Sequence, residues 1–156
     1  MPIQTTQQAP DFSLFDTEKN KVSLTDQKDS NVVLLFFPLA FTSTCTKELC
    51  SVRDNIAQFN NANAKVFGIS VDSLHTLAKY KADQNLNFSL LSDFNKDVST
   101  AYGSIYEMFG YNMKGVSKRS AFVIDKNGVI RYVEILENAS EQPNFKEITL
   151  ILEELK

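Results

Sequence analysis

Both cysteines of the chain lie in one short stretch, PLAFTSTCTKELC, which spans residues 38–50. Cys45 and Cys50 are five residues apart, while Thr42 and Pro38 precede Cys45 by three and seven residues. Two thiols this close together can form a structural disulfide, bind a metal ion, act as a redox couple, or simply fill space in a core. The compartment, the fold and the neighbouring residues distinguish these four alternatives.

The composition is that of an ordinary soluble globular protein. The 156 residues are 43% hydrophobic and 22% charged, with a formal net charge of −3, so we expect a single domain over residues 1–156. No block of like charges and no bilayer-length apolar run occurs, which argues against nucleic-acid and membrane partners. The first ten residues lack the features of a secretory signal. We therefore expect a cytoplasmic protein, in which a disulfide would be transient rather than structural.

Strand-like and helix-like patterns alternate along the chain. Apolar runs predict buried strands at residues 32–37, 65–71 and 88–91. Two short strands around a polar turn are predicted near the N-terminus, within residues 12–24. Helical spacing follows at residues 49–59 and 74–86, with a short helix at 96–102. Asn127-Gly128 between two apolar runs predicts a hairpin, and Pro143 suits the first turn of a final helix.

This order of elements is typical of an α/β protein with a covered central sheet. We expect a thioredoxin-like sandwich, in which a mixed, mostly parallel sheet has helices on both faces and an N-terminal β-hairpin extension. Residues 103–118 are expected to be irregular. Neither a G-x-G-x-x-G sequence nor a P-loop occurs, so no nucleotide cofactor is expected.

Cys45 is the better placed of the two thiols for chemistry. If a helix begins near Ser43 or Thr44, Cys45 lies in its first turn, where free N–H groups and the helix dipole favour a thiolate. The strand before it delivers this turn to the carboxyl end of the sheet, where open α/β folds place their active sites. The Thr42 hydroxyl is expected to face the same pocket as the Cys45 sulfur. Pro38 stiffens the chain that leads to this turn. An unreactive buried thiol remains the alternative for a cysteine judged without its neighbours.

The neighbours resemble those of a known family. The pattern Pro38-x-x-x-Thr42-x-x-Cys45 resembles the active-site pattern of the peroxiredoxins, and Arg119 in KRSAFVID stands where that family has an arginine. The segments VFGISVD and LLSD, at residues 66–72 and 90–93, also resemble the family. The resemblance covers nearly the whole chain in the right order.

The resemblance implies that Cys45 is the peroxidatic cysteine of a thiol peroxidase. Its thiolate would attack a hydroperoxide and become a sulfenic acid. Arg119 would stabilise the thiolate and polarise the peroxide, and Thr42 would stabilise the charge that moves onto the peroxide oxygens. Glu48, one helical turn after Cys45, is expected to orient the guanidinium; the alternative is a solvated helix carboxylate.

Cys50 resembles a resolving cysteine, but the sequence leaves its role open. The C-x-x-x-x-C spacing is similar to that of the bacterioferritin comigratory (peroxiredoxin Q) branch, whereas PLAFT and KEL are similar to the alkyl hydroperoxide reductase E branch, which can work with one essential cysteine. On an intact helix the two Cα atoms would be roughly 8 to 9 Å apart, too far for a disulfide. We predict that Cys50 resolves the sulfenic acid after local unfolding; the alternative is an inert cysteine.

A second function, from a different class, is a thioredoxin-fold metal-binding or metallochaperone protein. In that case both thiols and His75, the only histidine, would be ligands. Copper-delivering relatives of this kind carry C-x-x-x-C and general dithiol oxidoreductases carry C-x-x-C, and neither occurs here. We expect His75 to be a surface residue, and no metal. Asp72 and Asp93, at the ends of strands, are expected to cap helices.

The remaining expectations concern partners. The resemblance implies a hydroperoxide substrate, and thioredoxin or a similar dithiol donor as the reductant. An unusually apolar loop could fold back on the core, line the approach of the peroxide, or form a homodimer interface; its members are Tyr102, Ile105, Tyr106, Met108, Phe109, Tyr111 and Met113. Gel filtration with light scattering distinguishes a monomer from the homodimer.

Overall fold

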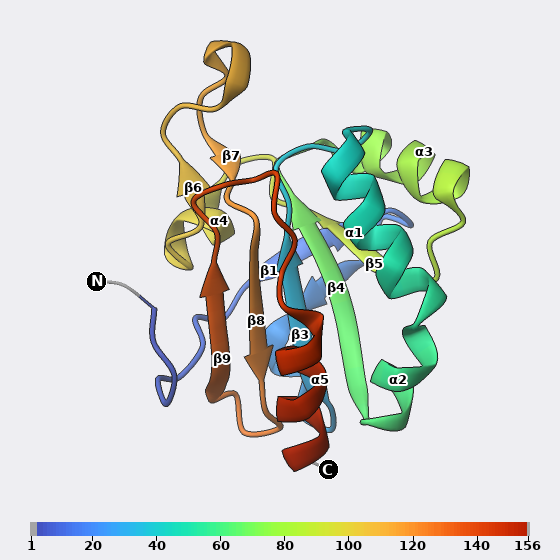
Figure 1. Ribbon diagram of the computed structural model, residues 1–156, viewed down its shortest axis with the longest axis vertical. Helices are drawn as coiled ribbons and strands as arrows, with labels where there is room; N and C mark the ends of the chain where they lie inside the picture. Colours follow the sequence, from blue (N-terminus) through green and yellow to red (C-terminus); the bar gives the residue numbers. More distant parts are fainter. Residues whose placement is uncertain (1–2, 156) are drawn as a thin grey trace.

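The computed structural model describes residues 3–155, and its centre is a seven-stranded sheet (Figure 1). The strand order is β2-β1-β5-β4-β3-β8-β9. The strands are β1 (Ser13–Asp16), β2 (Lys21–Ser23), β3 (Asn31–Phe36), β4 (Ala64–Ser70), β5 (Ser89–Ser92), β8 (Ser120–Ile124) and β9 (Ile130–Ile135). The thioredoxin-like α/β fold and the mixed sheet are therefore confirmed.

The pairing of the strands corrects one expectation. Only β3–β4 and β4–β5 are parallel, whereas the other four of the six neighbouring pairs are antiparallel. The sheet is thus mixed but not mostly parallel, because both hairpins join it as antiparallel edges. The N-terminal hairpin β1–β2 is present as predicted, and it pairs with β5.

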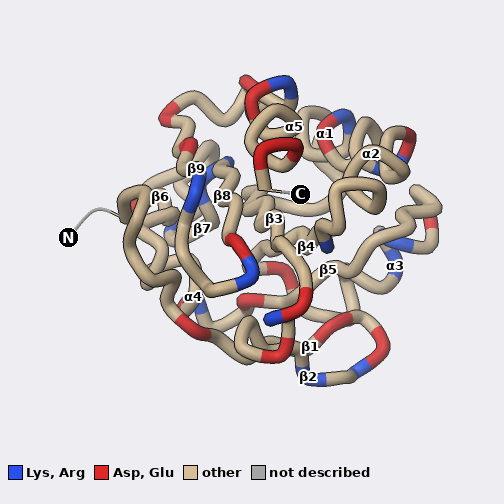
Figure 2. The backbone as a smooth tube through the Cα atoms, turned by 90° about the horizontal axis from the view of Figure 1, so that it is seen from below, with Lys and Arg blue, Asp and Glu red and all other residues tan. Residues whose placement is uncertain are grey.

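The helices cover both faces of the sheet, but unequally. They are α1 (Ser43–Asp54), α2 (Ile56–Asn61), α3 (Leu74–Gln84), α4 (Asp97–Ala101) and α5 (Phe145–Glu154), with 3-10 turns η1 (Leu24–Gln27) and η2 (Gly110–Asn112). Figure 2 shows α1, α2 and α5 on one side of the strands and α4 on the other. Within residues 3–155, no helix is long and apolar enough to span a membrane.

Strand β3 shows why both faces are covered. All six of its residues are buried, as expected of a strand with a layer on each side. Val33 and Leu35 join the core cluster that includes α1, α2, α3 and α5, whereas Leu34 and Phe36 join the cluster around α4 and the N-terminal segment. The alternation of side chains along the strand therefore divides the interior into two cores.

Two helix boundaries differ from the prediction. The apolar stripe of residues 49–59 is divided at Asn55, whose side-chain N–H donates to the Ser51 carbonyl oxygen at 2.9 Å. Asparagine side chains compete in this way with the backbone ladder of a helix. At the C-terminal helix, Asn144 is the N-cap and accepts from the Glu147 N–H, so Pro143 lies before the cap rather than in the first turn.

Residues 103–118 are more regular than predicted. They contain β6 (Ile105–Tyr106) and β7 (Val116–Ser117), which form a two-stranded antiparallel arm beside the main sheet. Figure 1 shows this arm projecting beyond the carboxyl end of β3. Tyr111 and Asn112 turn its tip with positive φ values of 60° and 62°. The strands are too short for an alternating pattern to be visible in the sequence.

Candidate active site

The register of β3 and β8 brings distant residues together. Phe36 of β3 pairs with Ser120 of β8, and the two strands are antiparallel. Arg119, directly before β8, therefore stands at the carboxyl end of β3, from which residues 38–42 lead into α1. In this way a residue 74 positions after Cys45 reaches the same site.

Cys45 lies in the first turn of α1, as predicted. The helix begins at Ser43 with Thr42 as its N-cap, and no side chain caps it. The first N–H groups of a helix have no partners within the helix, so this terminus leaves donors and the positive end of the dipole beside the sulfur. Cys45 is fully buried and forms no disulfide.

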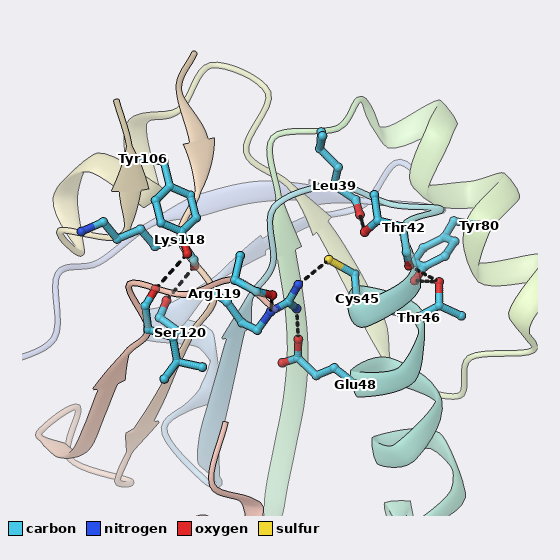
Figure 3. Close-up of polar contacts among 12 residues, drawn as sticks. Leu39, Thr42, Cys45, Thr46, Glu48, Tyr80, Tyr106, Lys118, Arg119 and Ser120 are labelled. Atoms are coloured by element: carbon cyan, nitrogen blue, oxygen red, sulfur yellow. Dashed lines mark hydrogen bonds and ion pairs between the residues drawn. The ribbon is translucent and has the colours of Figure 1, made fainter. Parts of the chain in front are cut away.

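The guanidinium of Arg119 holds three groups at once (Figure 3). Its Nη2 donates to Cys45 Sγ at 3.0 Å, its Nη1 to Glu48 Oε1 at 2.5 Å, and its Nε to the Ala139 carbonyl oxygen at 2.8 Å. Arg119 is only 2% exposed. Burial alone would lower its pKa, but Glu48 and Cys45 reverse that effect and raise it, so the guanidinium supplies a permanent positive charge to the sulfur.

Glu48 is a buried carboxylate rather than a solvated one. It is fully buried, and its contact with Arg119 is the one expected from the sequence. Burial raises the pKa of Glu48 to about 7, even though the Arg119 charge and hydrogen bond act in the opposite direction. Its second oxygen, Oε2, has no hydrogen-bond partner among the described residues. A single guanidinium therefore lies between two groups that can both become anions, Glu48 and Cys45.

The turn before α1 carries Thr42 and Pro38. The Thr42 hydroxyl donates to the Leu39 carbonyl oxygen at 2.8 Å. Its proton is therefore not available to a second acceptor, whereas the lone pairs of its oxygen can still accept a hydrogen bond. Pro38 is buried, and both residues line the same pocket as Arg119. The Thr42 oxygen can accept a further hydrogen bond in this arrangement, and stabilisation of charge on the peroxide by Thr42 stays a prediction.

Asp72 has a role that was not predicted from the sequence. Its Oδ2 accepts from the Ala40 N–H at 2.8 Å and from the Ser70 hydroxyl at 2.7 Å, so it anchors the turn that carries Thr42. The expectation that it caps a helix is wrong, because Ser73 is the N-cap of α3. Asp93 does accept from two N–H groups of α4. The position of Asp72 at the carboxyl end of β4 was the signal available in the sequence.

Helix α1 is attached to α3 through side chains on the face opposite Arg119 (Figure 3). The Thr46 and Tyr80 hydroxyl oxygens are 2.9 Å apart. The Phe41 ring packs on the Tyr80 ring with 4.9 Å between the ring centroids. Cys50 Sγ donates to Gln84 Oε1 at 3.5 Å. Burial raises the pKa of Tyr80 to about 12, so its hydroxyl stays protonated. Nothing in the sequence pattern distinguished Tyr80 or Gln84 from other residues of an amphipathic helix.

The apolar loop of residues 102–113 divides into three groups. Tyr102 is fully buried in the core around α4, and Tyr106 is 9% exposed. Phe109 is half-buried and lines the pocket beside Arg119. Three side chains stay exposed, namely Met108, Tyr111 and Met113. Part of the loop therefore packs on the core and part lines the pocket beside Arg119, and the exposed group leaves a homodimer surface as an expectation.

His75 lies apart from a possible ligand set. It is exposed in the first turn of α3. Within residues 3–155, no three side chains of the His, Cys, Asp or Glu type come together as a group that could hold a metal ion. The donor set that the metal-binding alternative requires is therefore absent from this part of the chain.

A thioredoxin-like sheet with a buried thiol held by an arginine at a helix N-terminus defines a class of thiol-dependent redox proteins. Comparison with known families gives a narrower assignment, since residues 5–133 match the AhpC/TSA family. This match covers well over half of the chain. The protein belongs to the AhpC/TSA family, and its relatives place it among the peroxiredoxins.

The relatives carry the names of both branches that the sequence resembles. A candidate peroxiredoxin of Mycobacterium tuberculosis is 44% identical over 124 residues, 78% of each chain. The candidate peroxiredoxin bcp of Coxiella burnetii is 41% identical over 135 residues, 85% of this chain and 89% of that one. Alkyl hydroperoxide reductase E of Mycobacterium bovis is 38% identical over 130 residues, 81% and 82% of the two chains. The recognition of a peroxiredoxin, and hence of an oxidoreductase with peroxidase activity, is confirmed.

A solved structure supports the same assignment. Peroxidoxin BcpB from Mycobacterium tuberculosis superimposes with a TM-score of 0.87 at 29% sequence identity, with 99% of each chain covered. The fold of this chain thus has a counterpart of nearly equal length.

Proposed function

We propose that this chain reduces hydroperoxides through the Cys45 thiolate. The observation that carries the proposal is the 3.0 Å contact between Arg119 Nη2 and the buried Cys45 Sγ, beside a pocket that Arg119 lines. The sulfur attacks one peroxide oxygen, the O–O bond breaks, and Cys45 becomes a sulfenic acid. The departing oxygen takes up a proton and leaves as water or an alcohol.

The other residues of the site act on the peroxide. Thr42 accepts a hydrogen bond from the O–H of the substrate, because its own proton is held by the Leu39 carbonyl. Arg119 and the uncapped N–H groups of α1 stabilise the negative charge that grows on the departing oxygen. Pro38 excludes water from one side of the sulfur. Glu48 holds Arg119 in the orientation that reaches both sulfur and substrate.

Oxidation by hydrogen peroxide tests the proposal. We expect the reduced protein to be oxidised at Cys45 at least roughly 100-fold faster than free cysteine, the acceleration typical of one aligned donor. The chain has no Trp, so rapid quenching with a thiol-alkylating reagent and mass spectrometry should follow the reaction. Cys45→Ser serves as the blank and Cys50→Ser as the matched control. A rate no faster than that of free cysteine would remove the peroxidase assignment.

We further propose that Cys50 resolves the sulfenic acid as an intramolecular disulfide. Both cysteines lie on the intact α1, where their Cα atoms are roughly 8 to 9 Å apart. The first turns of α1 must therefore unfold, which breaks the contacts of Phe41 and Thr46 with Tyr80 and that of Cys50 with Gln84. The Cys50 thiol then attacks the Cys45 sulfur, and water leaves.

Mass spectrometry after one equivalent of peroxide decides the role of Cys50. We expect a linked Cys45–Cys50 peptide in the wild type and a sulfenic acid at Cys45 in Cys50→Ser. Reduction of the linked form by thioredoxin or a similar dithiol donor, and not by a monothiol alone, would complete the proposed cycle. Accumulation of sulfenic or sulfinic acid at Cys45 in the wild type, with no linked peptide, would mean that Cys50 is inert and that one cysteine suffices.

A further inference from the structure

The pocket beside Arg119 is larger than hydrogen peroxide requires. Its volume is about 370 Å³, within the range of roughly 300–1,000 Å³ typical of sites for small organic molecules. A water-sized molecule takes up only about 30 Å³ in the liquid. Thr42 and Arg119 line one part of the pocket, whereas Phe109 and Gly110 of the arm and the loop of residues 138–140 line the remainder. The reacting end of a peroxide therefore leaves most of this space free.

Phe109 supplies the largest apolar side chain of this lining. It is half-buried, and its ring stacks on Tyr106 at 5.4 Å with an angle of 25° between the planes. The Phe109 N–H donates to the Met113 carbonyl oxygen at 2.7 Å, which fixes the backbone at the tip of the arm. The ring is thus held in place on one side by Tyr106 and presents its remaining surface to the pocket.

The scaffold that holds Phe109 also holds Arg119. The Tyr106 hydroxyl donates to the Leu136 carbonyl oxygen at 2.8 Å, and the Leu136 N–H donates to the Arg119 carbonyl oxygen at 2.8 Å. Three residues further along the same loop, Ala139 accepts from Arg119 Nε. The apolar wall and the cation are therefore placed relative to each other through one short segment, so a ligand can contact both.

We propose that Phe109 is a specificity-determining residue that binds the organic substituent of hydroperoxides R–O–O–H. This inference rests on the proposed function and deepens it by naming a residue that selects among hydroperoxides. The –O–O–H end meets Thr42, Arg119 and Cys45, and an apolar R group packs against the Phe109 ring. Hydrogen peroxide has no R group and gains nothing from this wall. Contact with an apolar substituent changes the relative rates of two substrates, because it lowers the energy of only one transition state.

The test compares two substrates in two variants of the arm. Phe109→Ala removes the wall, and Tyr111→Ala removes a ring on the same arm that is 99% exposed and does not line the pocket. Second-order rate constants for oxidation of Cys45 are measured with hydrogen peroxide and with cumene hydroperoxide. We expect Phe109→Ala to lower the cumene hydroperoxide constant about tenfold and the hydrogen peroxide constant less than twofold. Tyr111→Ala should match the wild type with both.

The ratio of the two rate constants separates the possible outcomes. An equal fall with both peroxides would mean that Phe109 only supports Arg119 through Tyr106, and it would overturn the proposal. Two rate constants that both stay at their wild-type values would overturn it as well. If Phe109→Ala does not fold, Phe109→Leu takes its place and should lower the cumene hydroperoxide constant by a smaller factor. A wild type that reacts with neither peroxide faster than free cysteine contradicts the peroxidase function itself, which is a different result from an altered ratio.

Discussion

Replacement of Arg119 by Met should slow the oxidation of Cys45 by hydrogen peroxide roughly 100- to 1,000-fold, the usual effect of removing one aligned donor from a developing charge. The side chain donates to the sulfur at 3.0 Å and lines the pocket that we propose for the peroxide. Met retains much of the apolar stem but neither the charge nor the donors. The measurement is the second-order rate constant for Cys45 oxidation in the quenched, alkylated protein.

Arg119→Lys should recover little of this loss. The three nitrogens of the guanidinium reach Cys45, Glu48 and the Ala139 carbonyl at the same time. A single ammonium cannot occupy these three positions, so it cannot be both held by Glu48 and directed at the sulfur. Arg131→Met is the matched control, since Arg131 pairs with Asp125 and is 46% exposed. A lysine variant with nearly wild-type rates would show that charge alone, without the fork geometry, is sufficient.

Replacement of Arg119 by Met should also destabilise the fold. Removing one member of a buried ion pair typically costs about 3–5 kcal/mol, because the other charge is left without a partner. Here that group is the fully buried Glu48 carboxyl. Without Arg119, which lowers its pKa, this carboxyl takes up a proton, so the loss is expected near or below the lower end of this range. Urea unfolding of Arg119→Met should therefore show a lower free energy of unfolding, and adding Glu48→Gln should restore much of it. Activity should stay low in the double variant, because the donor to the sulfur is still missing.

The fold was predictable from the sequence because its elements have strong local signals. The continuous apolar run that became β3 and the Asn127-Gly128 turn each belong to one structure class. The N-terminus of α1 was also predictable, because Thr42 follows a strand and precedes a helical stripe. The balance of parallel and antiparallel pairs was not, since hydrophobicity reports burial but not the direction of a neighbour.

Within the site, side-chain types were predictable and backbone partners were not. Cys45, Thr42 and Arg119 could be named from the resemblance of their pattern to that of the peroxiredoxins, and Glu48 from its place one turn after Cys45. The Ala139 carbonyl that holds Arg119 Nε belongs to a loop, and every residue has a carbonyl, so residue type carried no information. Contacts of this kind depend on how a loop returns to the sheet. The short strands of the arm were not predicted either, because a two-residue strand is too short to show the alternation of apolar and polar residues.

The Glu48 carboxylate both positions Arg119 and competes with Cys45 for its positive charge. Arg119 carries one positive charge, and Glu48 and Cys45 both lie within hydrogen-bond distance of it. If both become anions, one of them is uncompensated in a buried site, and like charges at this distance oppose each other. Glu134 adds a further negative charge that raises the pKa of Glu48. A carboxyl that is partly protonated near neutral pH can position Arg119 without competing fully for its charge.

The free energy of unfolding should therefore fall as the pH rises from about 5 to 8. Burial raises the pKa of Glu48 from its usual 4.5 to about 7. Between these values the folded chain binds more protons than the unfolded chain, so stability decreases with pH, and the loss is complete about one pH unit above the folded pKa. A rise of this size corresponds to about 3 kcal/mol. Glu48→Gln keeps an acceptor for Arg119 but cannot ionise, so this contribution disappears in the variant.

Subtracting the two proteins isolates Glu48 from the other titrating groups. Urea unfolding of the reduced wild type and of Glu48→Gln at pH 5, 6, 7 and 8 gives the difference in free energy of unfolding, which should shift by about 3 kcal/mol in favour of Gln. Asp125 leaves this window unaffected: although burial opposes it, N–H donors of Val129 and Asn127 together with Arg131 lower its pKa. Glu107→Gln, at an exposed position of the arm, should parallel the wild type. A difference that stays constant from pH 5 to 8 would mean that Arg119 keeps Glu48 ionised throughout, and that the carboxylate competes with the Cys45 thiolate at every working pH.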